Sequence, residues 1–378
     1  MAHEYEPNQT EHRYVILCLV DWRHAAIVHG DGSMSDIEQR KNDHLDIVLR
    51  NEKKVSPQTN GFRDINFIHC ALPELDLSQI DLSSKFLNKH VQAPLLISSM
   101  TGGPARSVSL NTNIALACNE LGLAFGVGSQ RIALEGTSTA GFSKDLRSAA
   151  PSAVILANFG AAQLRDWDGA EMARRAVDMI EADGLIIHLN PMQEAVQPNG
   201  DTNWTGILKK IEDICSTCSF PIICKEVGSG LSGTVAKQLI DAGVTVIDVA
   251  GSGGTSWVTV EAARAEDTIQ QQIAEPFHDW GIPTARAISD VRLNCPDTPI
   301  VASGGIRNGL DCAKSIRLGA NMAGIAAGIL NSAMHDERQL IEQLKIIIEQ
   351  LRITCFCTGS GDLAQLRRAP LLDPPTYI

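Results

Sequence analysis

Eight short apolar stretches, each followed by a glycine-rich or polar turn and then a helical pattern, recur along the chain after residue 90. Hydrophobicity within them is continuous rather than alternating, which is typical of strands buried on both faces, as in a parallel sheet covered by helices. Eight successive strand–helix units predict an α/β fold, a (β/α)₈ TIM barrel whose functional groups collect on the loops after the strands. The stretches are 93–99, 123–129, 153–159, 184–190, 221–227, 244–251, 299–305 and 321–328.

The remaining sequence predicts additions to this barrel, first among them an N-terminal helical extension. We expect residues 1–33 to be a weakly ordered, dispensable upstream segment, because Met34 stands just before a helical pattern and could itself begin a chain. Residues 34–90 are expected to form an arm with a helix over 36–52. The barrel is expected over 91–378, with a C-terminal helix over 336–352.

An interval of about 50 residues separates the sixth stretch from the seventh, which is too long for an ordinary strand–helix loop. It predicts an insertion at about 251–298, serving either as a lid over the active face or as decoration.

Composition limits the classes of partner. Hydrophobic residues make up 44% of the 378 residues and charged residues 20%, which allows a large core. The net charge of −12 argues against nucleic acid and anionic membranes as partners, and no apolar run reaches the ~18 residues of a membrane span. The ten cysteines lack the spacing of a disulfide framework, and the Cys215-x-x-Cys218 pair has no second ligand pair, so we expect a reducing, cytoplasmic compartment.

Glycine-rich turns after the last two stretches predict a phosphate site. In "SGGIRNG" and "GIAAG" the glycines allow close backbone approach, and the following helix N-termini favour an anion. Arg307 and Lys225 would add positive charge, Lys225 beside a reduced, anionic cofactor. A competing interpretation is the dinucleotide-binding pattern of "GSGLSG" at 228–233, with Asp248 in the next stretch, which would favour a doubly wound fold.

The fourth stretch ends in an unusual concentration of polar side chains, "HLNPMQE". Glu194 lies beyond a proline, and a carboxylate there, opposite a diphosphate, is a plausible Mg²⁺ ligand; an ordinary surface glutamate is the alternative. Arg40 and His44 share a face of the predicted N-terminal helix, with Lys41 at its edge. With Arg131 and His188 they would form the local basic cluster that an acidic protein needs to hold a diphosphate, unless they belong to a solvated charged helix.

These motifs resemble those of the type 2 isopentenyl diphosphate isomerases. The resemblance spans about residues 36–372 and includes "RKNDH", "ISSMTGG", "GVGSQR", "HLNPMQE", "KEVGSG", "AGSGGTSW" and "ASGGIRNG". It implies FMN in a barrel, used in reduced form with NADPH as electron source, and Mg²⁺ on the substrate diphosphate. The implied reaction interconverts isopentenyl diphosphate and dimethylallyl diphosphate without net redox, and the family tends to assemble as homo-tetramers or octamers.

The resemblance also implies roles for individual residues. Glu194 would bind Mg²⁺, while His188 and Gln193 are the catalytic candidates, with the reduced flavin rather than His188 expected to move the proton. The substrate would be held by Arg40, Lys41, His44, Ser129, Arg131, His188, Asn190 and Gln193. FMN would be held by Ser99, Met100, Thr101, Ser129, Asn158, Lys225, Thr255, Gly305, Ile306, Arg307, Ala326 and Ala327.

Two rival functions stay open at this level. Phosphate loops indicate FMN but not the reaction, so an FMN-dependent oxidoreductase on the same barrel is the first alternative. A non-catalytic phosphate-binding barrel is the second.

Overall fold

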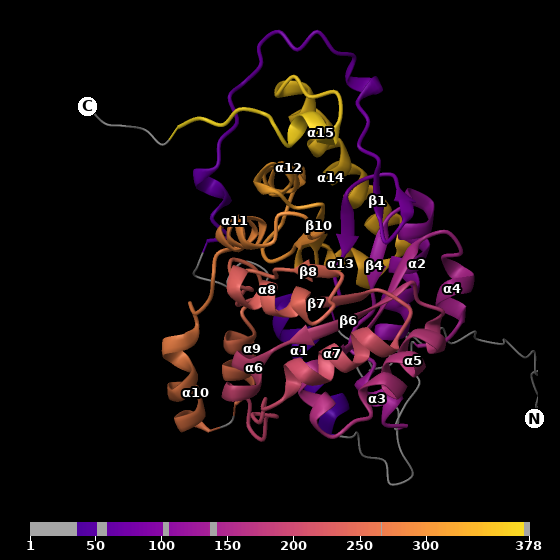
Figure 1. The fold of residues 1–378 in the computed structure, drawn as a ribbon, viewed down its shortest axis with the longest axis vertical. Helices are drawn as coiled ribbons and strands as arrows, with labels where there is room; N and C mark the ends of the chain where they lie inside the picture. The colour runs from indigo at the N-terminus through magenta and orange to yellow at the C-terminus, as the bar shows by residue number, and fades with distance from the viewer. Residues whose placement is uncertain (1–35, 51–58, 101–105, 137–141, 266, 374–378) are drawn as a thin grey trace, which may run out of the picture. The chain divides into compact units, whose positions relative to one another are not determined.

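A closed barrel of eight parallel strands forms the centre of the protein in a computed structural model. The structure describes residues 36–50, 59–100, 106–136, 142–265 and 267–373. The chain divides at Met34 into two units, and the expectations for residues 1–33 lie outside the described residues. The unit from Ser35 onward carries the barrel (Figure 1).

All eight predicted strands are present, in the order in which they follow along the chain, and β10 closes the barrel against β3. The predicted (β/α)₈ fold is therefore confirmed, and the doubly wound alternative is excluded by closure. The barrel strands are β3 (Leu95–Ile97), β4 (Ala124–Gly126), β5 (Val154–Gly160), β6 (Gly184–Leu189), β7 (Ile222–Glu226), β8 (Val246–Asp248), β9 (Ile300–Ala302) and β10 (Met322–Ile325).

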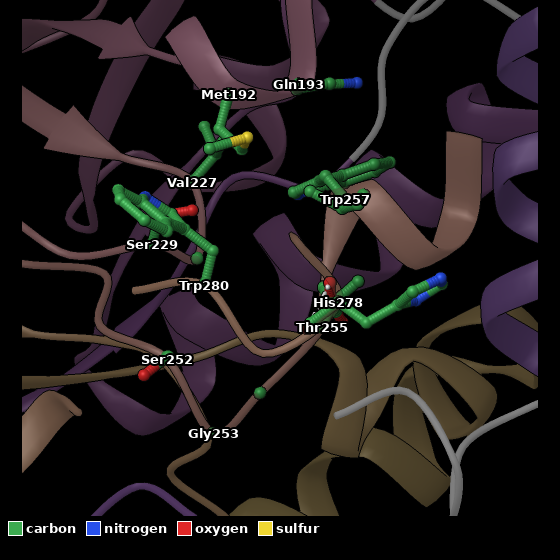
Figure 2. Close-up of a pocket in the computed structure, with 14 residues that line it drawn as sticks. Met192, Gln193, Val227, Ser229, Ser252, Gly253, Thr255, Trp257, His278 and Trp280 are labelled. Carbon is green, nitrogen blue, oxygen red and sulfur yellow. Dashed lines mark hydrogen bonds between the residues drawn. The ribbon is translucent and has the colours of Figure 1, made fainter. Parts of the chain in front are cut away.

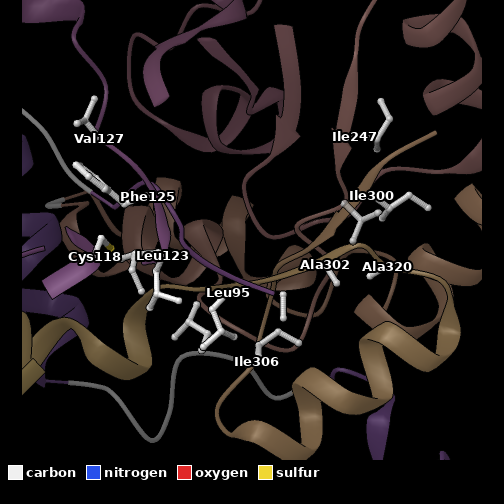
Figure 3. Packing of buried hydrophobic residues seen from close by; sticks show 14 of the residues in the cluster. Leu95, Cys118, Leu123, Phe125, Val127, Ile247, Ile300, Ala302, Ile306 and Ala320 are labelled. Carbon is white, nitrogen blue, oxygen red and sulfur yellow. The ribbon is translucent and has the colours of Figure 1, made fainter. Parts of the chain in front are cut away.

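Both faces of these strands are buried, as continuous hydrophobicity requires. Alternate residues such as Leu96, Ile186 and Val301 form a cluster inside the barrel. Their neighbours pack outward against the helices, as Figure 3 shows for Leu95 and Phe125. An antiparallel hairpin of β1 (Ser84–Phe86) and β2 (Lys89–Val91) adds Phe86 and Val91 to the inner cluster.

Helices cover the outside of the barrel. The predicted N-terminal helix is present as α1 (Asp36–Arg50), which contacts α9 and α13, and the predicted C-terminal helix extends further than expected, as α14 (Glu337–Cys357). None of the described helices is both long and apolar enough to cross a lipid bilayer. The other α-helices are α2 (Arg106–Leu121), α3 (Arg131–Leu134), α4 (Asp145–Ala149), α5 (Gly169–Ile180), α6 (Pro191–Val196), α7 (Ile207–Thr217), α8 (Gly233–Asp241), α9 (Trp257–Arg264), α10 (Thr268–Ala274), α11 (Thr284–Asn294), α12 (Gly309–Leu318), α13 (Ala327–His335) and α15 (Leu363–Leu366).

Short 3₁₀ segments complete the described structure: η2 (Phe62–Asp64), η3 (Leu77–Gln79), η4 (Ala161–Arg165) and η5 (Glu275–Phe277). The long interval after β8 holds α9, α10 and η5 before the barrel helix α11. A small apolar cluster of Val196, Val258 and Ala274 joins this interval to α6, at the carboxyl end of β6. The interval therefore packs beside the end of the barrel where functional groups collect.

Candidate active site

A cavity of about 370 Å³ opens where β3, β7, β9 and β10 end. Its size is in the range of cofactor pockets. Nine of the twelve residues predicted to hold FMN line it: Ser99, Met100, Lys225, Thr255, Gly305, Ile306, Arg307, Ala326 and Ala327. Ser129 and Asn158 line an adjoining cavity, and Thr101 lies outside the described residues.

The loops after β9 and β10 have the chemistry that a phosphate group requires. Helix α12 is capped by its own Asn308, whose side chain accepts from the N–H of Asp311. Helix α13 begins beside the cavity without a side-chain cap, so no capping side chain competes with an anion for its first N–H groups. Gly305 has φ +73, and a Cβ there would lie 2.4 Å from the carbonyl oxygen of Gly253, which explains why this loop needs glycine.

Polar groups in the cavity wall also lack partners. The hydroxyls of Ser98 and Ser99 are buried and make no hydrogen bond to any described residue. Lys225 is buried, its Nζ donates 2.7 Å to the carbonyl oxygen of Glu226, and its side chain lines the cavity. Unpaired donors, a buried cation and an uncapped helix are the features that a flavin with a phosphate tail would satisfy, so the residues present suit FMN.

A second, basic cavity of about 130 Å³ adjoins the first, and the two share Ser99, Met100, Lys225 and Trp257 among their walls. It gathers every residue predicted to bind the substrate, together with the predicted metal ligand Glu194: Arg40, Lys41, His44, Ser129, Arg131, His188, Asn190, Gln193 and Glu194. The sequence places these residues in α1, in the turn after β4 and at the end of β6. Their convergence gives an acidic protein a local cluster of cations.

The "HLNPMQE" stretch folds as a strand end followed by a helix. Pro191 stands at the start of α6, where its fixed φ suits the first helical turn and its missing N–H costs no hydrogen bond. Asn190 Nδ2 donates to Glu194 Oε1 at 2.8 Å and to Gln193 Oε1 at 3.3 Å. One amide therefore orients both side chains, while the Asn190 Oδ1 atom is buried without a partner among the described residues.

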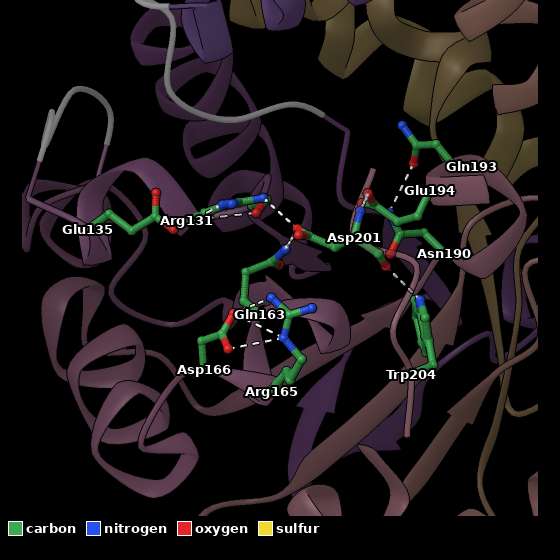
Figure 4. Close-up of polar contacts among 11 residues, drawn as sticks. Arg131, Glu135, Gln163, Arg165, Asp166, Asn190, Gln193, Glu194, Asp201 and Trp204 are labelled. Carbon is green, nitrogen blue, oxygen red and sulfur yellow. Dashed lines mark hydrogen bonds and ion pairs between the residues drawn. The ribbon is translucent and has the colours of Figure 1, made fainter. Parts of the chain in front are cut away.

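Glu194 is buried, and both its oxygens are held. Besides the Asn190 bond, Oε2 accepts from the backbone N–H of Asp201 at 2.8 Å. Asp201 in turn accepts from Arg131 Nη1 at 3.2 Å and from Gln163 Nε2 at 3.1 Å (Figure 4). Each carboxylate oxygen of Glu194 keeps a lone pair that accepts no hydrogen bond from a described residue. This one side chain can therefore still coordinate a cation. Among the described residues no group of three His, Cys, Asp or Glu side chains is placed to hold a metal by itself.

Gln193 is fixed by a residue that the sequence analysis missed. Glu261 in α9 accepts from Gln193 Nε2 at 2.9 Å, lies 3.0 Å from His44 Nε2 and accepts from Arg264 Nη1 at 2.9 Å. Burial opposes ionisation of Glu261, but the hydrogen bond and charge of His44, with the bond from Gln193, lower its pKa to about 2. Glu261 is therefore a carboxylate that ties α1, α6 and α9 together at the basic cavity.

His188 is neutral in this site. Asn158 Nδ2 donates to the carbonyl oxygen of Val127 at 3.0 Å, which turns Asn158 Oδ1 toward His188 Nδ1 at 2.8 Å. Because Oδ1 accepts, Nδ1 carries the proton and Nε2 keeps a lone pair. Burial, with the charges of Lys225 and Lys41, lowers the pKa of His188 to about 3.

The "GSGLSG" loop binds an anion that the protein itself supplies. Glu226 follows Lys225 in β7 and points to the other face, as strand alternation requires. Its Oε2 accepts from the backbone N–H groups of Val227, Gly228, Ser229 and Gly230, at 2.7, 2.6, 2.5 and 3.0 Å. The N–H groups that would hold a dinucleotide phosphate are thus already engaged, and the dinucleotide interpretation of this motif is wrong.

Comparison with known proteins agrees with this geometry. The FMN-dependent dehydrogenase family matches residues 146–373. In fold, the chain is similar to a mandelate oxidase variant with the monooxide FMN adduct (TM-score 0.60, 14% identity, covering 83% of this chain and 90% of that chain). It is also similar to a putative lactate oxidase of Pediococcus acidilactici (TM-score 0.60, 12% identity, 88% and 95% covered).

Fold, phosphate loops and family match together define a flavin-binding barrel of the FMN-dependent dehydrogenase class. Within that class, the chain belongs to the isopentenyl-diphosphate delta-isomerases. It is 55% identical over 340 residues to the enzyme of that name from Stutzerimonas stutzeri, covering 90% of this chain and 98% of the relative. The Pseudescherichia vulneris enzyme is 55% identical over 333 residues (88% and 96% covered), and that of a Nostoc species 46% over 332 residues (88% and 95% covered).

Proposed function

We propose that this protein interconverts isopentenyl diphosphate and dimethylallyl diphosphate, with FMN in the 370 Å³ cavity and the substrate in the basic cavity beside it. The observation that carries the proposal is the shared wall of the two cavities, which includes Met100, Lys225 and Val227. A substrate whose diphosphate lies on the basic cluster would present its hydrocarbon to the flavin across this wall. Isomerisation by a reduced flavin needs that arrangement, because the proton must pass between the ring and the reacting carbons.

The diphosphate is proposed to lie among Arg40, Lys41 and Arg131, with Ser129 and His44 beside them. Lys41 Nζ donates to the carbonyl oxygen of Ser129 at 3.3 Å, which holds the lysine over the turn after β4. Glu194 would bind Mg²⁺ together with diphosphate oxygens and water, since Mg²⁺ is commonly held by one or two carboxylates plus phosphates. Asn190 and the Asp201 N–H keep that carboxylate in place.

When bound and reduced, FMN supplies an electron-rich ring that exchanges a proton with the substrate and stabilises positive charge on it. The chain's own residues position the reactants. Lys225 balances negative charge beside the cofactor, and Gln193, held by Glu261 and Asn190, orients the alkene. His188 offers an acceptor at Nε2 rather than a proton, which supports its assignment to orientation. Val227 and Trp257 add apolar surface to the cavity wall, where water would otherwise quench a carbocation.

NADPH is the proposed reductant, and the family resemblance is its support. A homo-oligomer, tetramer or octamer, is proposed on the same ground. A reducing cytoplasmic location agrees with the nine described cysteines, all of which are free thiols.

The decisive experiment is an anaerobic assay with isopentenyl diphosphate, FMN, Mg²⁺ and NADPH, each omitted in turn. Isomerisation is expected to need FMN and Mg²⁺, with one reduction serving many turnovers. NADPH consumed in proportion to product would instead favour an oxidoreductase. A colourless protein that binds no FMN and converts no substrate would overturn the proposal.

A further inference from the structure

A larger, apolar cavity of about 770 Å³ lies beside the active site, between α6, α7 and α8 and next to residues 280–282. Side chains such as Leu189, Ile211 and Leu239 form its wall. None of the described residues that line it is a lysine, arginine or histidine. Glu226 is the ionisable side chain among them, and its carboxylate is engaged by the four backbone N–H groups described above. The cavity therefore suits a hydrocarbon and offers no cationic side chain to a phosphate.

Shared lining residues connect the apolar cavity to the substrate site by way of a third, small cavity. Glu194 and Gln193 line the basic cavity, Gln193 and Met192 line a constriction of about 10 Å³, and Met192 also lines the apolar cavity. Because successive side chains of a helix point about 100° apart, Glu194, Gln193 and Met192 lead around α6, from the proposed metal site past the proposed alkene position to the apolar cavity. The order matches that of a prenyl diphosphate, in which the diphosphate, the reactive double bond and the hydrocarbon chain follow one another.

One wall of the constriction is an exposed side chain, Trp280. Figure 2 shows Met192 and Val227 close to Trp280, with Trp257 across the gap. Trp280 is 59% exposed, and its ring meets Phe277 edge-on at 6.1 Å between centroids. The backbone beside it is anchored, because Ile282 N–H donates to Ser229 O at 2.8 Å. Opening the constriction therefore requires a rotation of the exposed indole and no rearrangement of the barrel.

We propose that the apolar cavity holds the hydrocarbon chain of a prenyl diphosphate longer than five carbons, whose diphosphate binds the same basic cluster as the substrate. The inference rests on the proposed function, because it uses the same diphosphate site. Such a molecule is a longer homologue of the allylic product and shares its head. It would occupy the active site and compete with isopentenyl diphosphate, so longer prenyl diphosphates would restrain the reaction that supplies their building blocks.

The first test is a chain-length series. Dimethylallyl, geranyl and farnesyl diphosphate, with inorganic diphosphate as the head alone, are titrated into FMN-loaded protein with Mg²⁺ by calorimetry. The affinity is expected to rise with chain length, with the fifteen-carbon compound at least about tenfold tighter than the five-carbon one, since each buried methylene adds to binding. In activity assays, farnesyl diphosphate is expected to compete with isopentenyl diphosphate. Equal affinity across the series would overturn the proposal.

The second test uses the outer rim. Leu208 and Val235 line the apolar cavity and are 43% and 37% exposed, so Leu208→Glu and Val235→Glu are compatible with folding. Both are expected to weaken farnesyl diphosphate binding at least about tenfold, because a charge would meet the chain, with dimethylallyl diphosphate unaffected. Leu310→Glu in α12, equally exposed at 43% and outside this cavity, is the matched control and should change neither.

Two results separate this inference from its alternatives. If Leu208→Glu lowers the sedimentation mass while farnesyl diphosphate binds as before, the cavity belongs to an interface between copies of this chain and the proposal is wrong. If the protein binds these diphosphates but isomerises none of them, the proposed function fails, while the chain-length series still decides what the apolar cavity accepts.

Discussion

Gln193 donates a 2.9 Å hydrogen bond from Nε2 to Oε1 of Glu261, a residue 68 positions further along the chain. The bond joins α6 to α9, in the long interval after β8, so two segments that are distant in the sequence fix one amide. Because Asn190 Nδ2 donates to the other end of the same amide, Gln193 has one orientation in the site.

We expect Glu261→Gln to lower kcat by about 10- to 100-fold, because a misplaced orienting group slows the reaction without abolishing binding. The KM for isopentenyl diphosphate should change less than kcat. Glu275→Gln, at an exposed residue of the same interval, is the control. Steady-state kinetics of both variants would show whether Glu261 acts through Gln193. Equal losses in the two variants would refute that role.

Glu194→Gln is expected to raise the Mg²⁺ concentration needed for half-maximal activity at least about tenfold, since an amide oxygen is a weaker ligand than a carboxylate. FMN binding should not change, because Glu194 lines the basic cavity and not the 370 Å³ cavity proposed for FMN. Magnesium titrations of the variant and of Glu342→Gln, on the exposed side of α14, provide the comparison. An unchanged Mg²⁺ requirement would remove Glu194 from the metal site.

Lys225→Met should weaken FMN binding at least about tenfold, because a buried charge-assisted contact is lost. The flavin's reduction potential should fall as well, since the reduced, anionic form would lose its neighbouring cation. Fluorescence titration and a dye-linked redox titration measure the two quantities. Lys225→Arg retains the positive charge, so the flavin's reduction potential in this variant should be close to that of the parent protein. A potential unaffected in the methionine variant would contradict this role.

The low pKa of His188 predicts an acid-sensitive contribution to stability. Folded His188 has a pKa of about 3, against an ordinary value of 6.5, because of burial and the charges of Lys225 and Lys41. Between those values the unfolded chain binds a proton that the folded chain does not, so the free energy of unfolding falls as pH drops from 6.5 toward 3.

Chemical denaturation between pH 7 and pH 5 would measure this contribution as the difference between the parent protein and a variant that lacks His188. The carboxylate of Glu261 loses its own contribution at lower pH, between 4.5 and 2. His188→Gln keeps a polar side chain but cannot titrate, so its stability should depend less on pH over this range. Identical pH slopes for the variant and the parent protein would show that His188 titrates normally.

Most of the barrel could be predicted from the sequence, because strands that are buried on both faces have continuous runs of apolar residues. Residues such as Leu96 and Ile97 are both apolar, and they point to opposite faces that are both covered. The site residues could be predicted where a strand end marks them, as with Lys225 and His188. Strand alternation also explains why Lys225 and Glu226 lie on opposite faces of β7.

The role of Glu261 could not be predicted, because it depends on how α9 packs against α6 and α1. No short sequence pattern indicates that packing. The same holds for Asp201, which contacts Arg131 from a loop with no strand signal. The "GSGLSG" motif misleads for a related reason. Its glycines indicate a loop with available N–H groups, but the pattern does not say which anion they bind.

Glu226 has a consequence for the order of events in the protein. Gly228 packs so closely that a Cβ there would lie 2.6 Å from the carbonyl oxygen of Thr255, a residue of the proposed FMN site. The Glu226 carboxylate already orders this loop. The conformational entropy of the loop is therefore lost when the protein folds and not when the cofactor binds. One wall of the flavin site is therefore preorganised before the cofactor binds.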